Sequence, residues 1–161
     1  MNEDIIADMG KYVISTKPDV LSCLALGSCV GVALWDSQLC IGGLAHVMLP
    51  SSKLLGVKEG QNVNKFADYA VPNMVKDLQA KGVEISRIKA KLVGGAHMFR
   101  GIATSVDDIG KRNSESVKEE LKKLNIQVIA EILGGSVGRT TRLILETGVY
   151  TIRSKEGTKE I

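Results

Sequence analysis

The sequence has little of what nucleic-acid and membrane functions usually require. Aromatic residues make up 4% of its 161 residues, and its 21 basic side chains are scattered among 18 acidic ones, for a net charge of +3. Nucleic-acid-binding domains typically carry a basic stripe or an aromatic platform, so we expect no nucleic-acid partner. No apolar run is long enough to cross a bilayer, so we also expect no direct membrane insertion.

Cysteine and histidine are also scarce. The sequence contains three cysteines and two histidines, namely Cys23, Cys29, Cys40, His46 and His97. The odd number of cysteines and the absence of a secretory signal pattern predict reduced thiols in a cytoplasmic protein. Structural zinc sites usually bring close ligand pairs such as CxxC, which are missing here. Metal binding through these five residues is therefore a minor alternative, and we expect no cofactor.

The length and the 44% hydrophobic content predict one globular domain over residues 1–161. Short apolar runs bounded by turn formers predict strands at residues 11–15, 19–25, 30–35, 39–45, 88–92, 126–133, 139–146 and 149–153. Apolar stripes predict two main helices, one over residues 67–78 and one that Asn113 caps. Residues 51–64 are expected to form a long loop and residues 154–161 a frayed tail. This pattern favours an α+β fold with mixed or antiparallel sheets.

The hairpin predicted around Ser37 and Gln38 matters most, because it joins a cysteine to a histidine. If these two residues form the whole loop, Cys29 lies directly opposite His46 on the paired strand. Residues opposite each other in an antiparallel pair share a face, with Cβ atoms about 4.5–5.5 Å apart. A three-residue loop or a bulge would instead place the two side chains on opposite faces.

A thiol beside an imidazole can act as a nucleophile. A free cysteine has a pKa of about 8.5, and a paired histidinium can lower it by several units. The preceding Gly27 and Ser28 favour a sharp turn whose amide groups can point at a developing oxyanion. The alternative is that Cys29 is a small core residue and His46 an ordinary strand residue.

Several motifs in the chain resemble those of the chemoreceptor glutamine deamidase family, CheD. The two most specific are Leu26-Gly27-Ser28-Cys29-Val30-Gly31 and Gly43-Leu44-Ala45-His46-Val47-Met48-Leu49-Pro50. The others follow in order: Ala67-Asp68-Tyr69-Ala70-Val71-Pro72, Gly94-Gly95-Ala96, Met98-Phe99, Ile109-Gly110, Arg112-Asn113, Gly134-Gly135, Gly138-Arg139 and Thr147-Gly148. The resemblance implies that Cys29 is the nucleophile and His46 its base. It also implies a three-layer α/β/β sandwich like that of deamidating toxin catalytic domains.

The same resemblance implies the substrate and the partners. The substrate is expected to be glutamine side chains of methyl-accepting chemotaxis receptors, and some family members also hydrolyse receptor glutamyl methyl esters. A second partner is the phosphatase CheC. The alternative is a protein that serves mainly as an interaction module for CheC and receptors, with weakened catalysis. His97 has no role in the resemblance, and as an alternative it is a second site residue.

One position departs from the family pattern. The family usually has a threonine six residues before the nucleophile as the third catalytic member, and Cys23 stands there in this chain. A threonine hydroxyl accepts a hydrogen bond from an imidazole, whereas a cysteine sulfur is a weak acceptor. Either Cys23 holds the ring loosely, or a backbone carbonyl takes its place.

Overall fold

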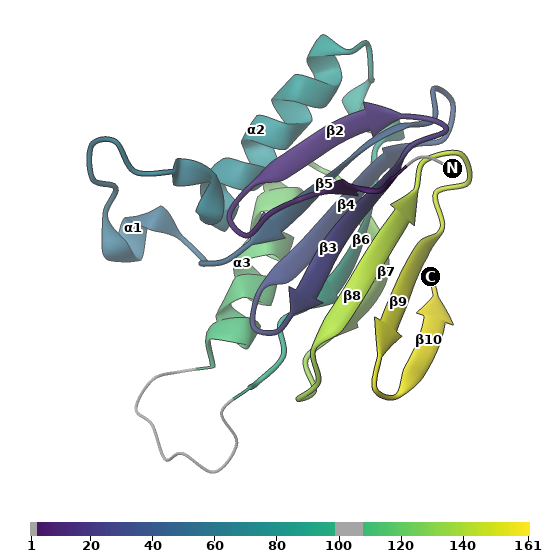
Figure 1. The fold of residues 1–161 in the computed structure, drawn as a ribbon. Helices are drawn as coiled ribbons and strands as arrows, with labels where there is room; N and C mark the ends of the chain where they lie inside the picture. Colours follow the sequence, from purple (N-terminus) through teal and green to yellow (C-terminus); the bar gives the residue numbers. More distant parts are fainter. Residues whose placement is uncertain (1–2, 99–107) are drawn as a thin grey trace.

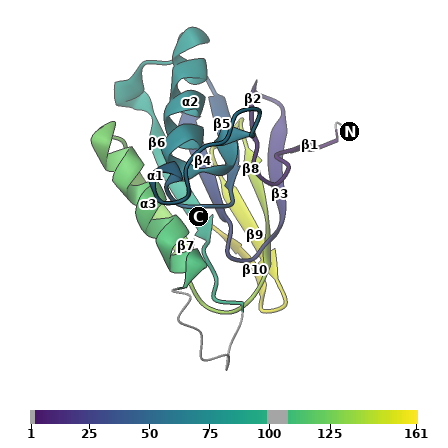
Figure 2. The same ribbon diagram turned by 90° about the vertical axis from the view of Figure 1, so that its left-hand side faces the viewer.

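The computed structural model describes residues 3–98 and 108–161. Over these ranges, ten strands form two five-stranded sheets that stack on each other, and two long helices cover the outer face of one sheet (Figures 1 and 2). The predicted α+β class with mixed sheets and two main helices is therefore confirmed. No helix in the described ranges is long and apolar enough to span a membrane.

The sheet under the helices has the strand order β2-β5-β4-β6-β7. Its strands are β2 (Tyr12–Thr16), β5 (Ile41–Val47), β4 (Val30–Asp36), β6 (Lys89–Gly94) and β7 (Gln127–Leu133). β6 and β7 pair in parallel, and the other neighbours are antiparallel.

The second sheet has the order β1-β3-β8-β9-β10 and ends at the yellow strand in Figure 1; among the described residues, no helix covers it. Its strands are β1 (Ile5–Ile6), β3 (Val20–Leu26), β8 (Arg139–Ile144), β9 (Tyr150–Ser154) and β10 (Gly157–Glu160). The tail predicted to be frayed therefore forms an edge strand. Ile161 and Tyr150 exchange two backbone hydrogen bonds of 3.0 Å, which hold the chain end on the sheet.

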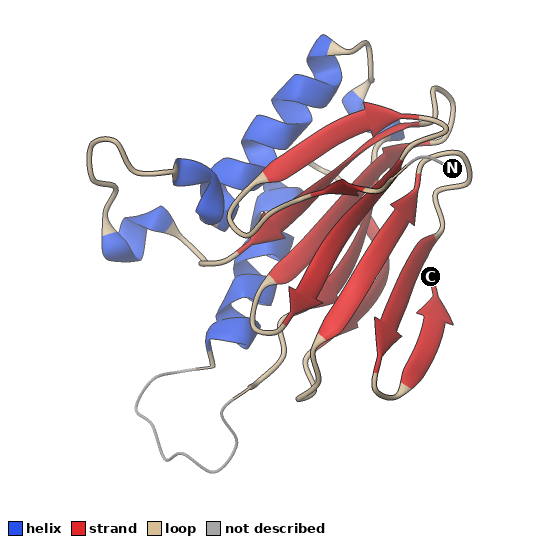
Figure 3. Cartoon of the chain, in the orientation of Figure 1, coloured by secondary structure: helices blue, strands red, loops and turns tan. Residues whose placement is uncertain are grey.

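The helices (blue in Figure 3) are α1 (Ser52–Leu55), α2 (Ala67–Ala80) and α3 (Ile109–Lys123), with single 3₁₀ turns at Val63–Lys65 and Ile85–Arg87. The predicted stripe of α2 is buried, as expected: Ala67, Ala70, Val71, Met74, Val75 and Leu78. The prediction that Asn113 caps α3 was wrong. Asp108 caps this helix by accepting a hydrogen bond from the Lys111 amide, and Asn113 lies inside it. Phe99 of the sequence motif lies outside the described residues.

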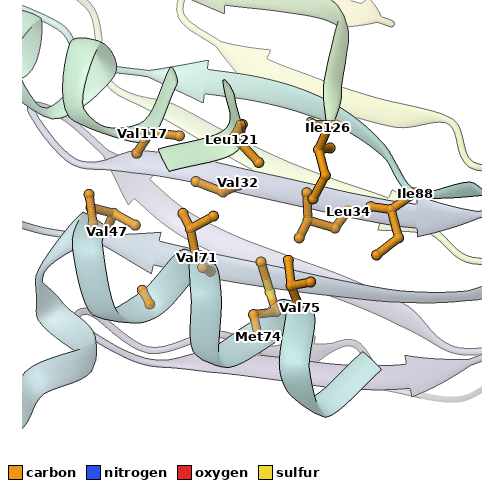
Figure 4. Packing of buried hydrophobic residues seen from close by; sticks show 14 of the residues in the cluster. Val32, Leu34, Val47, Val71, Met74, Val75, Ile88, Val117, Leu121 and Ile126 are labelled. Atoms are coloured by element: carbon orange, nitrogen blue, oxygen red, sulfur yellow. The ribbon is translucent and has the colours of Figure 1, made fainter. Parts of the chain in front are cut away.

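Two apolar clusters fill the two interfaces between the layers. The first lies between the helices and the sheet below them, where Val71, Met74 and Leu121 pack on Val32 and Leu34 (Figure 4). The second lies between the two sheets. Alternate residues of β4 and β5 face one cluster or the other, since side chains alternate along a strand. One face of the helix-covered sheet thus packs against the helices, and its other face packs against the second sheet.

Candidate active site

The hairpin of β4 and β5 has a four-residue turn in place of the predicted two-residue loop. Asp36 pairs with Ile41, so the turn comprises residues 37–40, and His46 pairs with Gly31 rather than with Cys29. The predicted register was wrong by two positions. Because a shift of two preserves the face, Cys29 and His46 remain on the same side of the sheet as diagonal neighbours.

Cys29 lies one residue before β4, at the face between the sheets. Its side chain is partly buried and packs against the second cluster. Its carbonyl accepts a hydrogen bond of 2.9 Å from the Gly95 amide, which extends the β4–β6 pairing by one residue. Diagonal neighbours on one face are about 7–8 Å apart at the backbone, within reach of long side chains.

His46 is 3% exposed and has a defined tautomer. Its Nδ1 lies 3.2 Å from the carbonyl oxygen of Ala7. A carbonyl can only accept, so Nδ1 carries the hydrogen, and in the neutral ring Nε2 keeps its lone pair. Nε2 is buried and has no hydrogen-bond partner among the described residues. The ring thus presents an unoccupied base, and no hydrogen bond yet joins it to Cys29.

Burial determines the protonation of both groups. It raises the pKa of the Cys29 thiol, although the backbone amide of Cys29 opposes this shift. Burial also lowers the pKa of His46, against smaller opposing effects of the Ala7 carbonyl and Asp8. The raised pKa of Cys29 and the lowered pKa of His46 both disfavour the resting thiolate–histidinium pair that the sequence suggested. Both shifts favour the neutral form of the group, and a neutral imidazole is suited to general base catalysis.

Cys23 lies on β3 of the opposite sheet and faces the same interface. It is fully buried and pairs with Thr141 across the β3–β8 ladder. Burial and then the nearby Cys29 raise the pKa of its thiol strongly, so Cys23 remains protonated. No hydrogen bond joins Cys23 to His46 within the described structure, and it is the Ala7 carbonyl that contacts Nδ1.

The turn at Gly27 and Ser28 is held through its carbonyl groups. The Gly27 carbonyl accepts from the Ala96 amide and the Ser28 carbonyl from Asn113, both at 2.9 Å. Among the described residues, the amide groups of Gly27, Ser28 and Cys29 donate no backbone hydrogen bond outside the strand ladders. These amides are therefore the candidate donors to an anionic oxygen at this turn.

The glycine pair after β6 supports this turn at close range. Gly94 has a φ of +121°, and a Cβ at this position would lie 2.2 Å from the Cys29 carbonyl oxygen. Arg139, which is 8% exposed, donates to the Gly94 carbonyl at 3.2 Å. The backbone behind the thiol is therefore packed too tightly for any residue but glycine at position 94.

The remaining cysteine and histidine lie elsewhere. Cys40 lies in the four-residue turn, with its sulfur near the carbonyls of Ser37 and Glu146. The Nδ1 of His97 lies 3.4 Å from the Asp108 carboxylate, and both side chains are partly exposed. No group of three or more potential ligands could hold a metal ion within residues 3–98 and 108–161. The metal alternative thus gains no support.

The sequence left open a backbone carbonyl as the partner of the His46 ring, and the structure identifies it as that of Ala7. Its position could not be predicted, because a backbone group leaves no signal in the side-chain pattern. A second group at the site was not identified from the sequence. Asn113 was interpreted as a helix cap, yet its side chain is fully buried and contacts the backbone beside both Cys29 and His46. Its place in the Arg112-Asn113 motif was the only available signal.

Comparison with known proteins agrees with the resemblance. A family model described as CheD chemotactic sensory transduction matches residues 48–154. A Clostridium botulinum (strain Hall) protein named probable chemoreceptor glutamine deamidase CheD is 44% identical over 158 residues, 97% of this chain and 94% of that protein. A Desulforamulus reducens protein of the same name is 42% identical over 157 residues, 95% of this chain and 92% of that protein. This chain therefore belongs to the CheD family.

Proposed function

We propose that this protein is a chemoreceptor glutamine deamidase that uses Cys29 as nucleophile and His46 as general base and acid. The relatives' name supplies the reaction and the substrate class. The observation that carries the assignment of residues is the unoccupied Nε2 of His46. It lies on the same face of the sheet as the Cys29 thiol, and the ring is fixed by the Ala7 carbonyl.

In the first half of the reaction, Nε2 of His46 takes the proton of the Cys29 thiol. The sulfur attacks the carboxamide carbon of a glutamine, and the carbonyl π electrons move to oxygen. The tetrahedral intermediate collapses when Nε2 returns the proton to the departing nitrogen, releasing ammonia and leaving a thioester. Catalytic hydrogen bonds are often long in unliganded enzymes and shorten when substrate binds, which agrees with the unjoined pair described above.

In the second half, water attacks the thioester carbon while Nε2 of His46 accepts a proton from it. The carbon–sulfur bond breaks, glutamate is released, and Cys29 regains its proton from the imidazole. The net reaction consumes one water and releases one ammonia. The same steps hydrolyse a glutamyl methyl ester, with methanol as the leaving group, so we include receptor methylesterase activity in the proposal.

The free amides of the turn before the thiol are proposed to bind the oxyanion. The held carbonyls of Gly27 and Ser28 turn the amides that follow them, those of Ser28 and Cys29, to the opposite side of each peptide plane. Removing one such donor costs about 3 kcal/mol of transition-state stabilisation in well-studied hydrolases. We assign no catalytic step to Cys23, whose buried thiol remains protonated.

The finer expectations from the resemblance belong to the same proposal. We propose that the protein works in the cytoplasm as a single domain, on the helical bundles of the receptors. The stacked sheets with helices on one side agree with a fold like that of deamidating toxin domains. CheC is the proposed second partner. A binding role without catalysis is the alternative, and measurable ammonia release distinguishes the two.

The test is ammonia release from a recombinant cytoplasmic chemoreceptor fragment. The wild-type protein is expected to release ammonia, and Cys29→Ala is expected to release none. The matched control is Cys40→Ala, because Cys40 is also partly buried but lies in the turn between β4 and β5. Retention of wild-type turnover by Cys29→Ala would remove Cys29 from the mechanism.

A further inference from the structure

Asn113 joins the two chain segments that carry the reacting groups. It lies on α3, is fully buried, and donates from Nδ2 to the carbonyls of Ser28 and Met48, each at 2.9 Å. Ser28 directly precedes the nucleophile, and Met48 follows His46 by two residues. One side-chain amide thus holds both segments, while among the described residues no hydrogen bond joins it to either reacting side chain.

This contact lies where the pairing of β4 with β5 stops. The last pair is Val30 with Val47, so Cys29 lies one position beyond the ladder. After Val47 the chain turns to another partner, since the amides of Met48 and Leu49 both donate to the Lys65 carbonyl. The Asn113 side chain bridges the two segments at this point, where backbone pairing no longer joins them.

The orientation of the Asn113 amide is fixed by its partners. Two carbonyl oxygens face Nδ2, and exchanging Nδ2 with Oδ1 would set three oxygens against one another. Oδ1 is buried without a hydrogen-bond partner in the described part of the chain. A buried acceptor left unpaired destabilises a fold, and such groups in native structures call for an explanation. The two hydrogen bonds from Nδ2 are therefore made although Oδ1 gains no partner among the described residues.

The peptide between Ser28 and Cys29 links this contact to catalysis. In a planar trans peptide, the carbonyl and the following amide point in opposite directions. Asn113 holds the Ser28 carbonyl, so the Cys29 amide points away from Asn113. The same amide lies close enough to the Cys29 sulfur to lower the pKa of the thiol. During attack the carbonyl carbon of a substrate bonds to that sulfur, so its oxygen comes close to the same amide, and this proximity is the basis of the inference below.

We propose that Asn113 is a positioning residue for the deamidation reaction: it orients the Ser28–Cys29 peptide so that the Cys29 amide donates to the oxyanion. The inference rests on the proposed function, because it assumes that Cys29 is the nucleophile. Asn113 acts through this backbone group and does not contact the substrate.

The variants are Asn113→Ala, which removes both donors, and Asn113→Ser, which keeps a small polar group should the alanine variant fail to fold. The control is Asn73→Ala. Asn73 lies on α2 and also donates from Nδ2, to Asn64 Oδ1 at 2.9 Å, but away from the thiol. Each protein is measured for kcat and KM of ammonia release from the receptor fragment, per folded protein, and for the rate at which iodoacetamide alkylates Cys29.

Alkylation needs the Cys29 thiol but forms no oxyanion. It therefore separates an effect on the reactivity of the thiol from an effect on oxyanion binding. We expect Asn113→Ala to lower kcat about 100-fold with KM within about threefold of wild type, the size of effect seen when one oxyanion donor is lost. We expect alkylation to change by less than about threefold, Asn113→Ser to fall between, and Asn73→Ala to match wild type.

Two results would overturn the inference. One is a kcat per folded molecule that stays within about threefold of wild type in both Asn113 variants, which would make the contact purely structural. The other is an alkylation rate that falls as far as kcat does, which would place the effect on the thiol. Failure of the proposed function looks different: the wild type releases no ammonia, or Cys29→Ala still does.

Discussion

The ring of His46 donates from Nδ1 to the carbonyl oxygen of Ala7 over 3.2 Å, across the boundary between the two sheets. Ala7 follows β1, which pairs with β3, whereas His46 belongs to β5 of the other sheet. The hydrogen bond fixes the tautomer in which Nε2 is the base. The orientation of the catalytic ring thus depends on the packing of the sheets against each other rather than on a third side chain.

The pH dependence of activity follows from the burial of this ring. The pKa of His46 is lowered from its ordinary value of 6.5, so the neutral base persists at pH values below 6.5. We expect the acid limb of kcat/KM to have its midpoint below pH 6.5, since kcat/KM reports the free enzyme. A pH profile of ammonia release measures it, and His97→Gln should leave the midpoint unchanged. A midpoint at or above 6.5 would contradict the account.

The thiol should titrate in the opposite direction. Burial raises the pKa of the Cys29 thiol above the ordinary value for a cysteine. We therefore expect the rate of iodoacetamide alkylation at Cys29 to keep rising above pH 9, because only the thiolate reacts. Cys29→Ala gives the background from the other cysteines. A plateau near neutral pH would instead indicate a resting thiolate–histidinium pair.

Replacing Cys23 by the threonine usual in the family should change little. The Nδ1 of His46 already has the Ala7 carbonyl as its partner, and a threonine hydroxyl at position 23 would face Thr141 across the ladder. We expect Cys23→Thr to keep kcat for ammonia release within about threefold of wild type. A gain of tenfold or more would mean that the natural site lacks a ring-orienting group.

The glycine behind the nucleophile should tolerate no side chain. A Cβ at Gly94 would meet the Cys29 carbonyl oxygen, and φ there is +121°. We expect Gly94→Ala to lower the free energy of unfolding by about 3 kcal/mol, from strain and overpacking together. Urea denaturation measures the loss. Gly60→Ala is the matched control: its φ is +77° with nothing within 4 Å, and it should cost about 1 kcal/mol. Equal losses would refute the close contact.

The stability of the protein should depend on an ion pair at the turn of this hairpin. The fully buried Asp36 carboxylate contacts Arg87 Nη2 at 2.9 Å, and the Arg87 guanidinium, set against the cost of burial, holds the pKa of Asp36 below its ordinary 3.8. Such a group stabilises the fold above that pH, and the stabilisation is lost as the pH falls through and below it. Arg87→Ala should therefore lower the urea midpoint more at pH 7 than at pH 3. Equal shifts at both pH values would exclude this ion pair as the cause.

The pattern of the sequence predicted the faces of the hairpin but not its register. Alternating apolar residues place Cys29 and His46 on one side of the sheet for any loop of even length. The length of the loop depends on two other features. Arg87, which is distant in the sequence, pairs with the buried Asp36 carboxylate, and Cys40 at the end of the turn adopts a φ of +51°. Neither feature is visible in the local pattern around Ser37.

Helix α2 was predictable because its stripe of small and branched apolar residues repeats at helical spacing. The position of Asn113 inside α3 was not predictable. Asparagine favours helix caps, and only tertiary contacts give its side chain two backbone partners. The edge strand β10 was missed for a similar reason. Its residues are all exposed, and pairing with β9 rather than burial makes them a strand.

The most direct test of Cys29 as a deamidating nucleophile is mass spectrometry of a receptor fragment after incubation with the protein. Deamidation replaces a carboxamide by a carboxyl group and adds about one dalton at each modified glutamine. We expect this gain with the wild type and none with Cys29→Ala. An unchanged mass with folded wild type, or the same gain with Cys29→Ala, would contradict this assignment.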